Sequence, residues 1–175
     1  EKEDFMAQES LLEGIYRGVL DERHLRTLEA AVCDLDRVDA LIERYQEILR
    51  DFPPREIEEQ GHIPVVMRQR MAEIGLFGVS IPQEYGGLGF NIWEYLRIVE
   101  GMARLDVSVA MAALAHLSIG VKGLVLFGSE AQKQQYLAPA AAGTMLFSYA
   151  LTEPKVGSDA QHIETFAELD EGGEH

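Results

Sequence analysis

Hydrophobic residues recur through residues 36–143 at the spacing of amphipathic helices, each burying one face against its neighbours. The pattern is strongest over residues 38–49, where the hydrophobic positions follow the i, i+3, i+4, i+7 rule. Asp36 is the expected N-cap of this helix, and Pro53 ends it because proline cannot continue the hydrogen-bond ladder. We therefore predict a mainly α fold, a helical bundle preceded by a helical extension of unknown role over residues 1–35.

Two polar pairs have the spacing of a capping box, in which an N-cap residue and a residue three positions later satisfy each other's backbone amides. Asn91 with Glu94 predicts the start of one helix, and Ser129 with Gln132 predicts the start of a second. We expect the second helix to end before Pro139.

The pattern changes in residues 144–175, which we expect to begin a second, β-rich domain. Residues 145–151 are apolar and aromatic, and residues 163–169 alternate between apolar and acidic side chains, so both predict strands. A hairpin turn is expected at residues 170–173. The chain stops where the partner strand would begin, so we expect a fragment of a longer protein. Residues 76–82, within the helical part, are also expected to be extended.

Charge and cysteine content exclude several classes of protein. The 30 acidic residues outnumber the 15 basic ones, and the resulting negative surface repels nucleic acid, so no nucleic-acid partner is expected. The single cysteine, Cys33, rules out a disulfide within the chain and is expected to be a buried structural thiol. The histidines share no metal-ligand spacing, so no metal site is expected. Residues 107–127 are apolar enough to cross a membrane, but His116 and Lys122 within them favour buried soluble helices.

Candidate chemistry gathers in residues 149–159, which run from a predicted strand into a turn. Gly157 lets the backbone approach a ligand, and with Ser158 it offers amides and a hydroxyl to a phosphate, although such a turn is more often only a turn. Two glycines within the apolar helical run, Gly120 and Gly123, indicate either close helix packing or space for a ligand.

The string Tyr-Ala-Leu-Thr-Glu-Pro-Lys-Val-Gly-Ser-Asp at residues 149–159 resembles the flavin-contacting segment of acyl-CoA dehydrogenases. Residues 81–89 resemble the Pro-x-x-Tyr-Gly-Gly-x-Gly loop of that family, and residues 126–137 resemble its Gly-Ser-x-x-Gln-Lys-x-x-Tyr-Leu segment. The resemblance covers about residues 36–169 and is closest to the very-long-chain branch at residues 115–123. It implies an N-terminal helical bundle followed by the first strands of a β-barrel-like middle domain.

The same resemblance implies which residues bind the cofactor FAD. Tyr149, Leu151 and Thr152 are implied to meet the isoalloxazine ring, largely through backbone groups and the Thr152 hydroxyl. Gly157 and Ser158 are implied to lie near the FAD pyrophosphate. Directional donors at the pyrimidine edge of a flavin raise its affinity for electrons, which suits hydride transfer.

The implied reaction is α,β-dehydrogenation of a long-chain acyl-CoA in fatty acid β-oxidation. Gly120, Gly123 and Ser158 are implied to lie at the substrate, the two glycines opening the floor of an acyl tunnel. No catalytic residue is expected here, because the family's base lies in a later domain and Glu153 only shapes its loop. The implied partners are acyl-CoA, an electron-transfer flavoprotein and further copies of the chain, forming a dimer or tetramer through a C-terminal domain.

Several alternatives stay open. An acyl-CoA oxidase would pass electrons to oxygen, a short- or branched-chain dehydrogenase would differ in substrate, and a non-catalytic helical module would keep only the ancestral surface. The acidic first residues do not resemble a basic presequence, so we expect a bacterial cytoplasmic protein, or a protein of the mitochondrial matrix if the source is eukaryotic. By itself, the 175-residue chain is expected neither to bind FAD tightly nor to turn over substrate.

Overall fold

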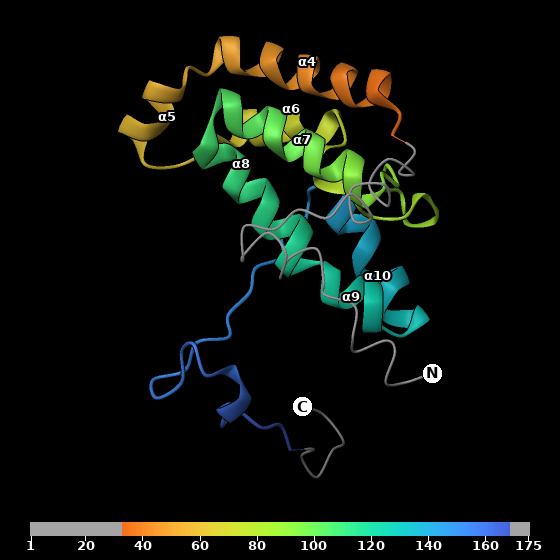
Figure 1. Cartoon of the computed structure of the whole chain (residues 1–175), viewed down its shortest axis with the longest axis vertical. Coiled ribbons are helices and arrows are strands. Elements are labelled where there is room, and N and C mark those ends of the chain that lie inside the picture. The colour runs from red at the N-terminus through yellow and green to blue at the C-terminus, as the bar shows by residue number, and fades with distance from the viewer. Residues whose placement is uncertain (1–32, 169–175) are drawn as a thin grey trace, which may run out of the picture.

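The computed structural model describes residues 33–168. Its α-helices are α4 (Leu35–Asp51), α5 (Pro54–Gln60), α6 (Val65–Glu73), α7 (Ile92–Leu105), α8 (Val107–Leu114), α9 (Lys122–Phe127) and α10 (Glu130–Ala141). The other helical elements are the 3-10 turns η1 (Leu76–Gly78), η2 (Gln83–Tyr85) and η4 (Ala160–His162), and the π-helical segment η3 (Ala115–Gly120). Figure 1 shows the α-helices gathered in one body, from which the residues after α10 extend as an open chain. The predicted mainly helical fold is confirmed.

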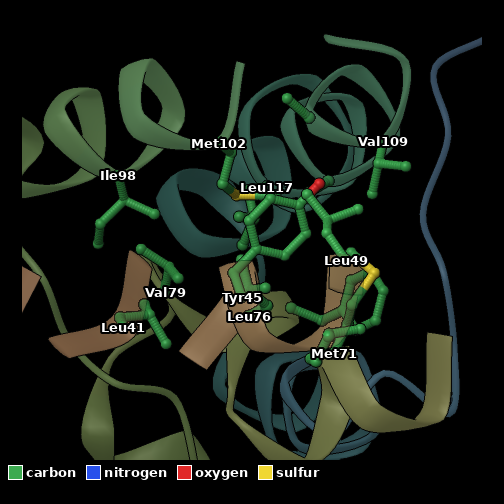
Figure 2. Packing of buried hydrophobic residues seen from close by; sticks show 14 of the residues in the cluster. Leu41, Tyr45, Leu49, Met71, Leu76, Val79, Ile98, Met102, Val109 and Leu117 are labelled. Atoms are coloured by element: carbon green, nitrogen blue, oxygen red, sulfur yellow. The ribbon is translucent and has the colours of Figure 1, made fainter. Parts of the chain in front are cut away.

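Helices α4 and α7 pack against each other and bury one face of each toward α6 and α8 (Figure 2). Tyr45 of α4 and Met102 of α7 lie where these faces meet, with exposed fractions of 0% and 2%. The two helices approach closely at Gly101, where a Cβ atom would lie 2.4 Å from Ile42 Cδ1. The hydrophobic spacing in residues 38–49 therefore predicted the buried face of α4 correctly.

The helix caps agree with the sequence except at α4. Asn91 and Glu94 form the predicted capping box at the start of α7, and the second predicted box forms at the start of α10. The N-cap of α4, however, is Asp34, whose carboxylate accepts the amide of Arg37 at 3.0 Å. The helix starts two residues earlier than predicted, which places Asp36 in the first turn, where its charge complements the helix dipole.

Helix α10 runs past Pro139 to Ala141, whereas the sequence predicted that it would end before the proline. Pro139 lacks the amide that would bond to the carbonyl of Gln135, so the helix loses this one bond and continues for two more residues. The left-handed Gly143, with φ of 66°, follows the helix end.

Three segments that were predicted to be extended or strands differ in the structure. Residues 145–151 and 163–168 contain no β-strand, because a strand needs hydrogen bonds from a second strand and neither segment has one in residues 33–168. Residues 76–82 instead form η1 and a tight loop, which the amide of Leu88 closes onto the carbonyl of Gly78 at 2.8 Å. The predicted hairpin turn and residues 1–32 of the N-terminal extension lie outside the described residues.

Two further sequence expectations concern Cys33 and the long apolar run. Cys33 is half-buried rather than buried. Helical residues Val107–Phe127 are the one stretch of the described chain long and apolar enough to cross a membrane, a property shared by core helices of soluble proteins. Within residues 33–168, no group of three His, Cys, Asp or Glu side chains could hold a metal ion.

Candidate functional site

The residues implied to contact FAD lie on the open chain after α10 (Figure 1). Tyr149 is 58% exposed, Leu151 is half-buried, and Thr152, Gly157 and Ser158 are exposed. Within the described part of the chain, the hydroxyls of Thr152 and Ser158 and the amides of Thr152, Gly157 and Ser158 make no hydrogen bond. The segment therefore presents an aromatic ring and several unengaged donors to its surroundings.

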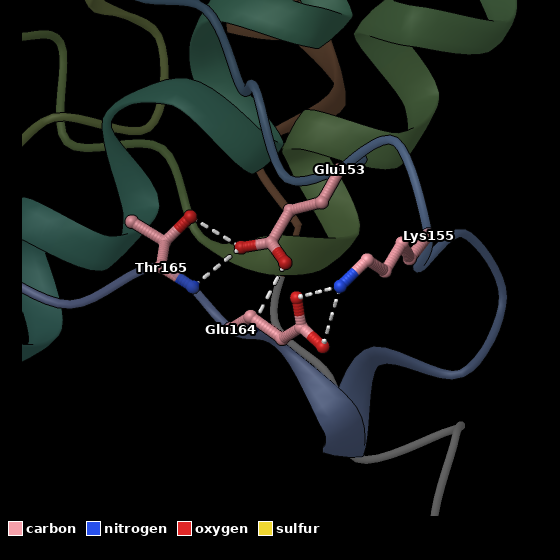
Figure 3. A network of polar contacts seen from close by, with 4 residues as sticks. All are labelled: Glu153, Lys155, Glu164 and Thr165. Carbon is pink, nitrogen blue, oxygen red and sulfur yellow. Dashed lines mark hydrogen bonds and ion pairs between the residues drawn. The ribbon is translucent and has the colours of Figure 1, made fainter.

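Glu153 folds the loop of residues 154–163 back on itself (Figure 3). Its carboxylate accepts the backbone amides of Glu164 and Thr165, each at 2.8 Å, and also accepts the Thr165 hydroxyl. These bonds lower the pKa of the Glu153 carboxyl, with the Thr165 hydroxyl as the largest cause. Lys155 reaches across the same loop to the Glu164 carboxylate at 3.1 Å, but this pair is exposed and adds little stability.

The open chain leaves the bundle at Phe147, which rests on η3. The Phe147 amide donates to Nδ1 of His116 at 3.0 Å, and Nε2 of His116 lies 3.1 Å from the Phe77 carbonyl oxygen. The His116 ring meets Phe77 edge-on, with ring centroids 5.6 Å apart, and is only 2% exposed. Burial lowers the pKa of His116. A Cβ atom on Gly120 would lie 2.8 Å from Phe147 Cβ, so Gly120 packs directly beneath Phe147.

A groove of about 520 Å³ lies between α9, α10 and the start of the open chain. Its lining is mostly apolar and consists of Gly123, Leu124, Phe127, Gly128, Gln132, Tyr136, Met145 and Phe147. Phe127 is 86% exposed, which is unusual for a large aromatic side chain on a helix. A Cβ atom on Gly123 would meet no atom within 4 Å, so this glycine borders open space.

The structure separates the residues implied to lie at the substrate. Gly123 lines the groove, Gly120 is covered by Phe147, and Ser158 is not among the lining residues. Sequence reasoning treated His116 only as a core histidine and did not single out Phe147. No sequence pattern could have predicted the contact between these two residues, because they are 31 positions apart and meet only in the folded chain.

Comparisons with protein families and with curated proteins agree with one another. The family described as acyl-CoA dehydrogenase, N-terminal domain, matches residues 39–144. The chain is 38% identical over 129 residues to the probable acyl-CoA dehydrogenase YngJ of Bacillus subtilis, a match covering 70% of this chain and 34% of YngJ. It is 44% identical over 99 residues to the human mitochondrial very long-chain specific acyl-CoA dehydrogenase, covering 57% of this chain and 15% of that protein.

Solved structures agree with the sequence relatives. The acyl-CoA dehydrogenase complexed with FAD from Bacillus anthracis matches with a TM-score of 0.70 and 34% identity over 83% of this chain and 25% of that chain. Butyryl-CoA dehydrogenase from Megasphaera elsdenii matches with a TM-score of 0.64 and 26% identity, covering 74% of this chain and 35% of that chain. The chain thus spans about a third, or less, of the length of these relatives.

Proposed function

Since the chain belongs to the acyl-CoA dehydrogenase family, we propose that it forms the N-terminal helical domain of an FAD-dependent oxidoreductase that acts on acyl-CoA. The observation that carries this proposal is the set of exposed, unengaged donors of Thr152, Gly157 and Ser158, on the chain that follows directly from the helical domain. In an ordinary surface loop, free amides and hydroxyls face water and an exposed Tyr149 has no particular role. Their occurrence together in the family's motif is what favours a ligand.

The donors of this segment fit the polar groups of a flavin nucleotide. The hydroxyl and amide of Thr152 would bind the pyrimidine edge of the isoalloxazine ring, against which Tyr149 and Leu151 would pack. The amides of Gly157 and Ser158 would hold the pyrophosphate, since a Cβ on Gly157 would meet no atom within 4 Å and the backbone is open to approach. FAD, when bound, supplies the acceptor for the hydride that leaves the substrate.

Glu153 is a carboxylate next to this segment, but we do not propose it as the catalytic base. Its carboxylate accepts three hydrogen bonds, and these bonds lower its pKa. A carboxylate held in this way is a weaker base and has no free oxygen aimed at a substrate. The base that removes the α-proton would therefore come from a part of the protein beyond these residues, and Glu153 would hold the loop in shape.

The groove beside Gly123 suits the acyl part of the substrate. Its apolar lining includes the exposed Phe127 and the half-buried Tyr136, and an aliphatic chain would cover both. We propose a long-chain acyl group. In the complete protein, Gly123→Leu should reduce activity on long acyl chains more than on short ones, because the added side chain enters the groove. Equal losses at all chain lengths would refute the groove as the acyl site.

The complete protein tests the proposed function directly. Purified and dialysed, it should retain FAD and reduce an artificial electron dye when an acyl-CoA is added. Oxygen consumption instead of dye reduction would favour the oxidase, and the absence of FAD would favour a non-catalytic module. The 175-residue chain alone should not retain stoichiometric flavin, because residues 149–158 supply only one side of the site. The same proposal includes electron transfer to an electron-transfer flavoprotein and assembly as a dimer or tetramer. Its expected location is the bacterial cytoplasm, or the mitochondrial matrix if the source is eukaryotic.

A further inference from the structure

The open chain is attached to the helical bundle through few backbone groups. The amides of Thr144 and Met145 both donate to the Pro139 carbonyl at 3.1 Å and finish α10. The amide of Phe147 then donates to His116 Nδ1 at 3.0 Å. Among residues 148–168, no backbone amide donates to the bundle. The bond at Phe147 is therefore the last backbone hydrogen bond that fixes the open chain to the bundle.

His116 makes this bond in one protonation state. Nδ1 accepts the hydrogen of the Phe147 amide, so Nδ1 carries no proton. Nε2 then carries the proton and donates it to the Phe77 carbonyl oxygen. A second proton, on Nδ1, would face the Phe147 amide hydrogen and break the bond. Only the neutral ring joins Phe77 to Phe147.

The π-helical segment η3 presents His116 and Gly120 to the same residue. The amide of Val121 bonds to the His116 carbonyl at 2.9 Å, five positions back, which is the π-helical pattern. The Ser118 hydroxyl donates to the Leu114 carbonyl at 2.7 Å within the same turn. Single π-helical turns inside α-helices occur frequently at functional sites. Here the turn forms a seat in which the histidine binds the Phe147 amide and the glycine leaves space for its backbone.

We propose that His116 is a positioning residue for the flavin-facing segment: its Nδ1 seats the Phe147 amide over Gly120 and so determines where Tyr149 and Thr152 leave the bundle. Tyr149 follows Phe147 by two residues, so it stays within about 7 Å of chain from the seat. A displacement of the Phe147 backbone would therefore displace Tyr149, the first residue implied to contact the flavin. The inference rests on the proposed function, because it takes FAD as the ligand of that segment.

Two substitutions of His116 in the complete protein separate positioning from packing. Asparagine places an acceptor oxygen near the position of Nδ1 and can keep the bond to the Phe147 amide. Glutamine places its amide near Nε2 and can keep the bond to the Phe77 carbonyl, but it leaves Phe147 without an acceptor. Each variant keeps one of the two bonds, so their stabilities toward urea should be similar. The readouts are the visible absorption spectrum of the bound flavin and the Kd for FAD, measured by titrating the apoprotein.

We expect His116→Asn to bind FAD nearly as the wild type does. We expect His116→Gln to bind it about tenfold more weakly, the effect of about one lost hydrogen bond, with a shifted flavin spectrum. A difference of less than about threefold between the two variants, or weaker binding by the asparagine variant, overturns the positioning role. If either variant fails to fold, Gly120→Ala decides, because its Cβ displaces Phe147 while His116 is unchanged. A shifted flavin spectrum in Gly120→Ala supports the proposal, and an unchanged spectrum overturns it.

The wild-type control keeps this inference separate from the proposed function. A complete wild-type protein without FAD refutes the proposed function itself, and with it the role of His116. A wild-type protein that binds FAD, together with asparagine and glutamine variants that bind it equally, refutes only the role of His116.

Discussion

Replacing Gly101 with alanine tests how α4 packs against α7. The new Cβ would lie 2.4 Å from Ile42 Cδ1 and 2.9 Å from Ile42 Cγ1, both well inside van der Waals contact. Ile42 must leave its rotamer or the helices must separate, and overpacking of this kind costs about 1–3 kcal/mol. Alanine also favours the helix by about 1 kcal/mol relative to glycine. The steric cost outweighs this gain, so Gly101→Ala should lower the free energy of unfolding by about 1 kcal/mol.

In a protein that already carries Ile42→Ala, Gly101→Ala should have the opposite effect on the free energy of unfolding. Ile42→Ala removes the three Ile42 atoms nearest to the new Cβ, including Cγ2 at 3.3 Å. In that background only the helix-propensity gain remains, so Gly101→Ala should raise the unfolding free energy by about 1 kcal/mol. Gly123→Ala is the matched control, because it lies in α9 and its Cβ would meet no atom within 4 Å. It should stabilise the chain by about 0.5–1 kcal/mol.

Urea unfolding of the 175-residue chain, followed by circular dichroism, measures these differences. The coupling between the two substitutions is the difference between the effects of Gly101→Ala in the two backgrounds, about 2 kcal/mol. Equal destabilisation in both backgrounds would show that the contact with Ile42 is not the reason for glycine, and the reasoning would fail.

Three further predictions concern polar groups. Glu153→Gln should speed amide hydrogen exchange at Thr165 near neutral pH, because the carboxylate that accepts this amide is lost. In the wild type, the Thr165 amide should lose this protection only as the pH falls through the lowered pKa of Glu153. Identical exchange at Thr165 in the two proteins would contradict this. Burial lowers the pKa of His116, so the unfolded chain binds more protons, and the free energy of unfolding should fall below about pH 6.5 by at most about 1.4 kcal/mol per pH unit. Urea unfolding across pH should give a smaller slope for His116→Asn. Glu94→Gln leaves one fewer acceptor oxygen for two part-buried amides, one of them the Asp34 amide at 3.0 Å, and should cost about 1 kcal/mol in urea unfolding. No loss would mean that water replaces the bond.

The sequence by itself determined the elements whose hydrogen bonds are local. The capping box of Asn91 with Glu94 joins atoms within three positions, so its residue types are enough to place the start of α7. The buried face of α4 followed from the spacing of its hydrophobic residues, because a helix repeats its own geometry without a partner. The motif in residues 149–159 likewise indicated the family from residue order alone.

Elements that depend on distant residues were predicted wrongly or missed. Residues 145–151 have strand-like composition but no second strand in the described chain, and composition cannot supply one. Residues 76–82 form a turn because the amide of Leu88 reaches back to them. Helix α10 runs two residues past Pro139 to Ala141, although residue type alone placed its end before the proline.

The two glycines of the apolar run were left undecided by sequence and were decided by tertiary structure. Both cost helix propensity, so the sequence indicates that each position needs a small residue without saying why. The fold lays the Phe147 backbone over Gly120 and leaves Gly123 open to the groove. Whether a missing side chain means close packing or free space depends on what another segment places there, and only the folded chain brings that segment to it.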